Sequence, residues 1–499
     1  MRKLKDVIVE KPWVGWVVFL VTLIIVFFIG LLGASIIERR TEAELTFQMV
    51  KPIAEWEPRN EVWGENFPRQ FQSYLNTLDT NFRSKYNGSG TVDMLARYPN
   101  LVINWAGYAF ARDYTQPRGH YHAIDDIRRT LRTGVPQPAT CWTCKSTDVP
   151  RMMNKIGVAN FYKGKWVDMG PEIVNPIGCQ DCHDPKTMDL RIVRPALVEA
   201  FQRQGKDITK ATQQEMRSLV CAQCHVEYYF KGEGKYLTFP WDKGNDADDV
   251  EKYYDSVKHV DFVHALSKTP ILKAQHPDYE VYTLGIHGQR GVACADCHMP
   301  YKTEGGVKFT NHWIQSPLNN IANSCQICHR ESEQTLTQNV YDRQDKCREL
   351  ANLAEHYLAT AHLEAKVAWD NGATDEQMKE VLKLIRAAQW RWDYATAGNG
   401  NMFHAPLEVA RILGNSIQKS QEARVLLASI FAKLNVPTPV KLPDVSTKEK
   451  AQKYLQLNMA QFVKEKNEFL KTVVPEWDKK AAERHQKMKY SNQGGQRNY

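Results

Sequence analysis

The chain has 499 residues, of which 43% are hydrophobic and 24% are charged, and its formal net charge is +8. This composition supports a sizeable core and excludes wholesale disorder. The basic residues are interleaved with acidic ones and form no clustered patch, so we expect no nucleic-acid partner. The mild positive balance favours small anionic ligands.

The first predicted element is a helix over residues 12–37, a stretch without any charged residue. About 20 apolar residues cross a bilayer, whereas the apolar part of a signal peptide typically has about 7–15. We therefore expect residues 1–37 to be an uncleaved membrane anchor. The alternative is a long signal peptide cut near Gly33-Ala34-Ser35.

Charges around this helix predict its orientation, because basic residues are retained on the cytoplasmic side. Those before the helix outnumber those after it, namely Arg2, Lys3, Lys5 and Lys11 against Arg39 and Arg40. We therefore expect a cytoplasmic N-terminus and a body on the periplasmic side of the cytoplasmic membrane.

Five C-x-x-C motifs follow within residues 38–342 and account for ten of the eleven cysteines. Four of them end in histidine, and C-x-x-C-H is the attachment signature of c-type haem. Zinc would use cysteine pairs two at a time and would not explain the adjacent histidines. We therefore expect five covalent haems, attached through Cys141, Cys144, Cys179, Cys182, Cys221, Cys224, Cys294, Cys297, Cys325 and Cys328. Cys347 is expected to be a buried thiol.

The short spacings between motifs predict that residues 38–342 form one catalytic core wrapped around the haems, because such short segments rarely fold alone. From about 343 to 490 the apolar periodicity predicts long helices. One ends at Asn371-Gly372, one begins after a capping box at Thr374, one begins at Pro406 and one begins near Ser446. No strand-rich region is evident, residues 491–499 resemble a flexible tail, and the expected fold is predominantly α.

Each haem iron has two axial positions. The motif histidines fill one position on four irons, and these ligands are His183, His225, His298 and His329. Electron-transfer haems usually have a second protein ligand, often histidine. Four other histidines have distinctive surroundings and are candidates for it: His120, His287, His312 and His404.

The first motif, CWTCK, ends in Lys145 instead of histidine. Either a distant histidine binds that iron, or the lysine amine does. An amine binds a metal only in its neutral form, which requires burial and the metal to displace a pKa that is ordinarily about 10.4. Because such a ligand gives a simple electron carrier little advantage, the divergent haem is predicted to be the catalytic one.

A reaction that reduces a small oxyanion needs fixed positive charge and proton donors near the open face of the iron. Arg132, Tyr228 and His276 are candidates for these roles. Their spacing in the sequence does not place them together.

The motif order resembles that of the pentahaem, ammonia-forming cytochrome c nitrite reductases, with one C-x-x-C-K motif ahead of four C-x-x-C-H motifs. The resemblance covers nearly all of the chain after the anchor and includes WAGYAFARDY, PRGHYHAIDD, TLRTG, CHVEYYF, KAQHPDYE and FHAPLE. It implies that Lys145 is the proximal ligand of the active-site haem, and that Arg132, Tyr228 and His276 form the distal pocket. It also implies that His312, His120, His404 and His287 are the distal ligands of the second to fifth haems, in that order.

The resemblance further implies a calcium ion beside the active site. Glu227 and Gln275 match its side-chain ligands, while Tyr228 and Lys273 match positions that offer backbone carbonyls. The implied reaction is the six-electron reduction of nitrite to ammonium. The implied partners are a second copy of the chain, docked through the long helices, and a membrane quinol-oxidising multihaem cytochrome as electron donor. The retained anchor differs from the usual soluble form of this family.

Two alternatives remain open at this point. One is a non-catalytic electron conduit in which protein ligands occupy both sides of all five irons. The other is hydroxylamine oxidation or sulfite reduction by the same scaffold.

Overall fold

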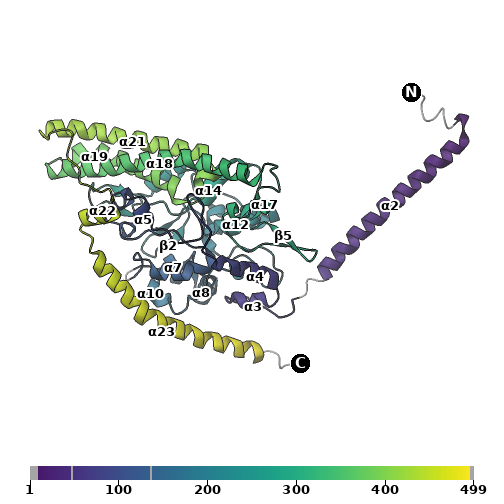
Figure 1. Ribbon diagram of the computed structural model, residues 1–499. Helices are drawn as coiled ribbons and strands as arrows, with labels where there is room; N and C mark the ends of the chain where they lie inside the picture. Colours follow the sequence, from purple (N-terminus) through teal and green to yellow (C-terminus); the bar gives the residue numbers. More distant parts are fainter. Residues whose placement is uncertain (1–8, 46–48, 135–136, 495–499) are drawn as a thin grey trace. The chain divides into compact units, whose positions relative to one another are not determined.

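The computed structural model describes residues 9–45, 49–134 and 137–494, and the chain divides into two compact units, Met1–Pro52 and Ile53–Tyr499. Figure 1 shows the chain from its N-terminus in purple to its C-terminus in yellow. The larger unit contains every C-x-x-C motif. It therefore contains both the expected haem core and the long-helix region.

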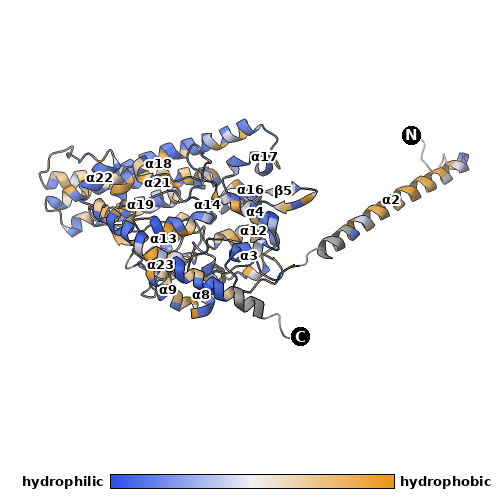
Figure 2. Ribbon diagram, turned by 60° about the horizontal axis from the view of Figure 1, so that its bottom comes forward, coloured by the Kyte–Doolittle hydropathy of each residue, from blue (hydrophilic) through white to orange (hydrophobic). Residues whose placement is uncertain are grey.

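The smaller unit is built on one helix, α2 (Pro12–Leu45). The most apolar 18-residue window within Pro12–Glu38 has a mean hydropathy of 3.0, and the ribbon of α2 is largely orange, the colour of hydrophobic residues, in Figure 2. The expected N-terminal apolar helix is thus confirmed, with the length and composition of either a membrane span or a signal sequence. Arg2, Lys3 and Lys5, on which the predicted orientation partly rests, lie outside the described residues.

Three long helices pack side by side in the larger unit: α18 (Glu333–Asp370), α19 (Asp375–Ala397) and α21 (Pro406–Lys433) (Figure 1). Leu358, Val381 and Leu413 are fully buried between them. Burying each such side chain contributes roughly 1.5–3 kcal/mol, so this bundle is a rigid support for what packs against it.

The ends of these helices follow local signals in the sequence. Thr374 and Gln377 form the expected capping box, and Pro406 occupies the first turn of α21. α18 begins at Glu333 instead of near 343, because the Ser332 hydroxyl accepts a hydrogen bond from the Thr335 N–H. The first turns of this helix are largely polar, so apolar periodicity did not reveal them. Thr447, the residue after Ser446, caps α22 (Lys448–Tyr454).

The last helix, α23 (Met459–Gly494), runs along the opposite side of the larger unit from the bundle (Figure 1). Its Trp477 is buried, with the ring edge-on to Trp166 and Phe469 at centroid distances of 5.5 and 5.2 Å. The helix extends into the region expected to be a tail from 491, and residues 495–499 lie outside the described chain.

The motif region consists of short helices and loops. The remaining α-helices are α3 (Asn60–Gly64), α4 (Pro68–Leu75), α5 (Met94–Arg97), α6 (Asn100–Asn104), α7 (Ala123–Arg129), α8 (Asp148–Ile156), α9 (Val158–Lys163), α10 (Trp166–Met169), α11 (Pro195–Arg203), α12 (Gln213–Ala222), α13 (Ala247–Ser256), α14 (Asp278–Leu284), α15 (Ile286–Gln289), α16 (Cys294–His298), α17 (Ile321–Ser324) and α20 (Asn401–His404).

Strands are few in the described chain and form three antiparallel pairs. These are β1 (Tyr229–Lys231) with β2 (Tyr236–Thr238), β3 (Phe262–Val263) with β4 (Pro270–Ile271), and β5 (Tyr301–Glu304) with β6 (Val307–Thr310). The prediction of a predominantly α fold is confirmed.

Candidate functional site

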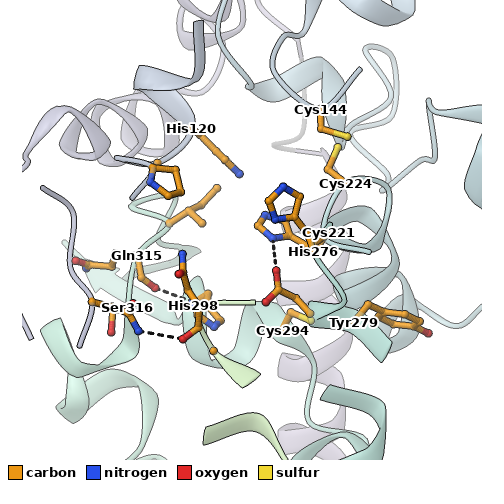
Figure 3. Close-up of a pocket in the computed structure, with 18 of the residues that line it drawn as sticks. His120, Cys144, Cys221, Cys224, His276, Tyr279, Cys294, His298, Gln315 and Ser316 are labelled. Atoms are coloured by element: carbon orange, nitrogen blue, oxygen red, sulfur yellow. Dashed lines mark hydrogen bonds and ion pairs between the residues drawn. The ribbon is translucent and has the colours of Figure 1, made fainter. Parts of the chain in front are cut away.

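A cavity of about 2450 Å³ runs through the larger unit. Every motif cysteine except Cys179 lines it, and so do Lys145, Arg132, Tyr228 and His276. Figure 3 shows His120, His276 and the thiols of Cys144 and Cys224 around the same open space. The part of the chain that carries the motifs therefore surrounds one continuous cavity.

Each histidine motif is wound into a helical turn that brings its ligating groups together. The backbone N–H groups of His183, His225 and His329 donate to the carbonyl oxygen of the first cysteine of their motifs, at 3.0, 3.0 and 2.9 Å. Residues three and four apart share one face of such a turn, so both sulfurs and the imidazole point the same way. In CWTCK the Lys145 N–H donates instead to the Trp142 carbonyl oxygen at 2.9 Å, which is a tighter turn.

Hydrogen bonds at Nδ1 orient the motif imidazoles. His183 Nδ1 lies 2.7 Å from the Met188 carbonyl oxygen, and His298 Nδ1 lies 2.8 Å from that of Gln315. His225 Nδ1 lies 3.1 Å from a carboxylate oxygen of Asp278. An Nδ1–H that donates to oxygen leaves Nε2 as the unprotonated, ligating nitrogen, as in most metal-binding histidines.

Three of these imidazoles face a second histidine. The ring centroids of His183 and His312 are 6.1 Å apart, and those of His298 and His404 are 6.3 Å apart. His329 and His287 are also separated by 6.3 Å. Metal–nitrogen bonds of about 2 Å on both sides of one metal, plus the half-width of each ring, add up to roughly this separation.

The fourth pairing involves His225 and His120. Burial lowers the pKa of His120 to about 3, and the largest charge contribution to this shift comes from His225. Both imidazoles line the cavity. His404 adds a buried Nδ1 that has no hydrogen-bond partner within the described residues. The histidine set is thus suited to holding metal between pairs of imidazoles.

The motifs themselves are also adjacent in space. The thiols of Cys144 and Cys224 interact directly, as Figure 3 shows, and those of Cys221 and Cys294 do the same. The third motif therefore lies between the first motif and the fourth. Redox groups attached to these cysteines would therefore lie close to one another.

The surroundings of Lys145 differ from those of the four histidine motifs. Burial of His276 lowers its pKa to about 3, and the positive charge of Lys145 is the second largest cause of this shift. Arg132 lies over the Phe110 ring, with its guanidinium carbon 4.1 Å from the centroid. Burial raises the pKa of Tyr228 well above its ordinary value, so its hydroxyl remains a donor. The structure thus brings the three predicted pocket residues to the cavity that Lys145 lines.

The four residues predicted to bind calcium lie together beside this pocket. The Gln275 N–H donates to Glu227 Oε2 at 2.6 Å, and the Gln275 amide donates to the Lys273 carbonyl oxygen at 3.1 Å. Glu227 is fully buried, which raises the pKa of its carboxyl well above the ordinary value. Within the described chain it has no basic partner, because the Lys273 ammonium binds Asp393 and the Ala274 carbonyl. Oxygen donors around an uncompensated carboxylate suit calcium.

Two residues that hold predicted ligands escaped sequence reasoning. Asp278 holds the His225 ring, and the Tyr254 hydroxyl donates to Glu227 Oε1 at 2.8 Å. Asp278 lies two residues after His276 in the motif KAQHPDYE, so its presence in that motif was the available signal. No local pattern pointed to Tyr254.

Comparison with known proteins identifies the family. Residues 59–489 match the sequence model described as cytochrome c552. The chain belongs to the cytochrome c552 family. Cytochrome c-552 of Parabacteroides distasonis is 60% identical over 481 residues, which cover 95% of this chain and 97% of that one. Cytochrome c-552 of Porphyromonas gingivalis is 59% identical over 480 residues and covers 94% and 96%.

A solved structure has the same fold as this cytochrome c552 family member. It is the catalytic subunit of cytochrome c nitrite reductase from Desulfovibrio desulfuricans, described as having two calcium sites. The two share 31% identity with a TM-score of 0.72, over 82% of this chain and 90% of that one. The predicted multihaem cytochrome fold is confirmed, and a nitrite reductase type of cytochrome is supported.

Proposed function

We propose that this protein reduces nitrite to ammonium, with six electrons, at a haem whose iron is bound by Lys145. The observation that carries the proposal is the difference in surroundings between Lys145 and the motif histidines. Three motif histidines have a second imidazole at 6.1–6.3 Å, and His225 shares the cavity with His120. Lys145 instead shares its part of the cavity with a guanidinium, a phenol and an imidazole, those of Arg132, Tyr228 and His276. Two histidines that bind opposite sides of a metal would leave no position for a substrate, whereas the residues around Lys145 can bind a substrate.

The residues suit c-type haem, because the motif cysteines are unpaired and all of them except Cys179 line a cavity together with oriented imidazoles, such as those of His225 and His298. Bound haem would supply an iron that coordinates small ligands and transfers electrons. Four relay haems would be held by His183 with His312, His225 with His120, His298 with His404, and His329 with His287. Lys145 would hold the fifth.

Arg132 provides a permanent positive charge for the substrate oxygens, since a guanidinium stays protonated at any physiological pH. His276 and Tyr228 donate hydrogen bonds to the same oxygens. The protons consumed as the nitrogen–oxygen bonds break come from solvent. The ammonium product carries a charge that Arg132 repels. The pocket therefore favours entry of an anion and release of a cation.

Calcium bound by Glu227, Gln275 and the carbonyls of Tyr228 and Lys273 would fix the loops that carry Tyr228 and His276. The solved nitrite reductase with calcium sites supports this assignment. We also propose that α2 anchors the protein on the periplasmic side of the membrane. A membrane quinol-oxidising multihaem cytochrome would supply electrons there, and two copies would associate through the long helices.

Two measurements test the proposal. The EPR spectrum of the oxidised protein should contain one high-spin or exchange-coupled haem beside low-spin signals. A spectrum with low-spin haem alone identifies the protein as a closed conduit. Assays with reduced viologen should convert nitrite stoichiometrically to ammonium, and faster turnover of hydroxylamine or sulfite would reassign the substrate.

A further inference from the structure

The turn that carries Arg132 is held by a carboxylate that does not touch Arg132 itself. One oxygen of Asp113 accepts hydrogen bonds from the Thr130 hydroxyl at 2.7 Å and from the Leu131 N–H at 2.9 Å. The other oxygen accepts from the Thr115 hydroxyl at 3.1 Å. Asp113 is thereby fixed in place and fixes Thr130 in turn.

The direction of the hydrogen bond at Thr130 determines how Arg132 is held. A carboxylate only accepts, so the hydroxyl hydrogen of Thr130 points to Asp113 and its lone pairs are left free. They accept from the Arg132 backbone N–H at 3.3 Å and from Arg132 Nε at 3.1 Å. Among the described residues no hydrogen bond involves the two terminal guanidinium nitrogens, which remain available to a ligand.

A second group holds the ends of the same turn. The Lys466 ammonium, on α23, donates to the carbonyl oxygens of Arg128 and Thr133 at 3.1 and 2.8 Å. It also donates to the Thr133 hydroxyl at 3.1 Å, and its side chain is 7% exposed. The backbone is thus held on both sides of Arg132, and the Arg132 guanidinium lies over the Phe110 ring. The Arg132 side chain therefore has little freedom to reorient.

We infer that Asp113 and Thr130 are positioning residues for anion recognition by Arg132, an inference that rests on the proposed function. A carboxylate paired directly with Arg132 would compete with nitrite for the guanidinium. Asp113 orients the Thr130 hydroxyl, and that hydroxyl accepts a hydrogen bond only from Nε of the Arg132 guanidinium. The two terminal nitrogens of Arg132 can therefore bind the two oxygens of a bent anion. The arrangement therefore orients the positive charge without neutralising it by contact.

The test is a nitrite titration of the oxidised, haem-loaded protein, followed by its absorption and EPR spectra, which needs no turnover. Hydrogen bonds to charged groups are worth enough that Thr130→Val should raise the nitrite dissociation constant about tenfold. Thr130→Ser, which keeps the hydroxyl, should stay within about twofold of wild type. Haem content and the low-spin signals should be unchanged in both variants.

A double-mutant cycle separates positioning from general damage. In an Arg132→Lys background, Thr130→Val should add less than about a twofold loss, because the group that it orients is already absent. Turnover of neutral hydroxylamine should be much less affected than that of nitrite. Equal nitrite affinity in wild type and Thr130→Val, or an undiminished loss in the Arg132→Lys background, overturns the inference while leaving nitrite reduction intact. A wild-type protein whose spectra do not respond to nitrite overturns the proposed function and this inference together.

Discussion

The imidazole rings of His298 and His404 lie edge-on to each other with centroids 6.3 Å apart, although they come from helices far apart in the sequence, α16 and α20. If both bind one iron, His404→Ala opens that iron to solvent. We expect an additional high-spin EPR signal, unchanged haem content and nitrite reduction lowered about tenfold or more. An unaltered low-spin spectrum would show that His404 is not a ligand.

Space behind His404 is provided by Gly400. A Cβ atom at this glycine would lie 2.4 Å from His404 Cε1, closer than nonbonded carbons approach. Gly400→Ala should therefore displace the His404 ring and give the spectral change of the His404 variant in weaker form. Gly234→Ala is the matched control, because a Cβ there meets nothing within 4 Å. EPR spectra of the two variants provide the comparison.

Replacing Lys145 tests the divergent motif. Lys145→His turns CWTCK into a fifth histidine motif and should leave the haem content near five, measured by the pyridine haemochrome assay. Turnover of nitrite should fall about tenfold or more, since imidazole changes the electron donation to the iron. Undiminished turnover would remove the special role of the amine.

Glu227→Ala should abolish calcium binding, measured by elemental analysis of the purified protein. Because calcium ligands fix the loops beside Tyr228 and His276, activity should drop about tenfold. Glu233→Ala, an exposed change on the neighbouring β1–β2 turn, should retain both the metal and activity. In the wild type, a chelator should lower activity and added calcium should restore it; insensitivity to both would exclude a functional calcium site.

A pH dependence of stability is expected from Glu355 of α18. Burial raises the pKa of this carboxyl from 4.5 to about 7, and the side chain is 4% exposed. Between pH 4.5 and about 7 the Glu355 carboxyl holds a proton in the folded state but not in the unfolded state. Its contribution to the free energy of unfolding therefore falls as pH rises. Glu355→Gln should leave stability unchanged near pH 4 and increase it at pH 8 by about 2–3 kcal/mol. Guanidinium unfolding curves at both pH values measure this, and equal stability at pH 8 would contradict it.

Local signals in the sequence predicted the helix caps and the attachment motifs, because each depends on residues within one turn. Thr374 with Gln377 and the cysteine turns are examples. The His183–His312 contact is not local, since nothing in the spacing of single histidines says which two face each other. Only the family resemblance suggested that pair. Asp113 and Thr130 were missed for the same reason: an ordinary aspartate and threonine acquire their role from a tertiary hydrogen bond.

The aromatic contact between α23 and the first motif has a consequence for biosynthesis. Trp477 covers Trp166, whose ring stacks on Trp142 of CWTCK at a centroid distance of 4.8 Å. Ribosomes make the chain from its N-terminus, so this cover is translated after all five motifs. A nonsense mutation between residues 434 and 458 would therefore release a protein that carries every attachment motif but leaves the first one unshielded. Its cysteines would be accessible to the attachment machinery while its reactive centre stayed unfinished.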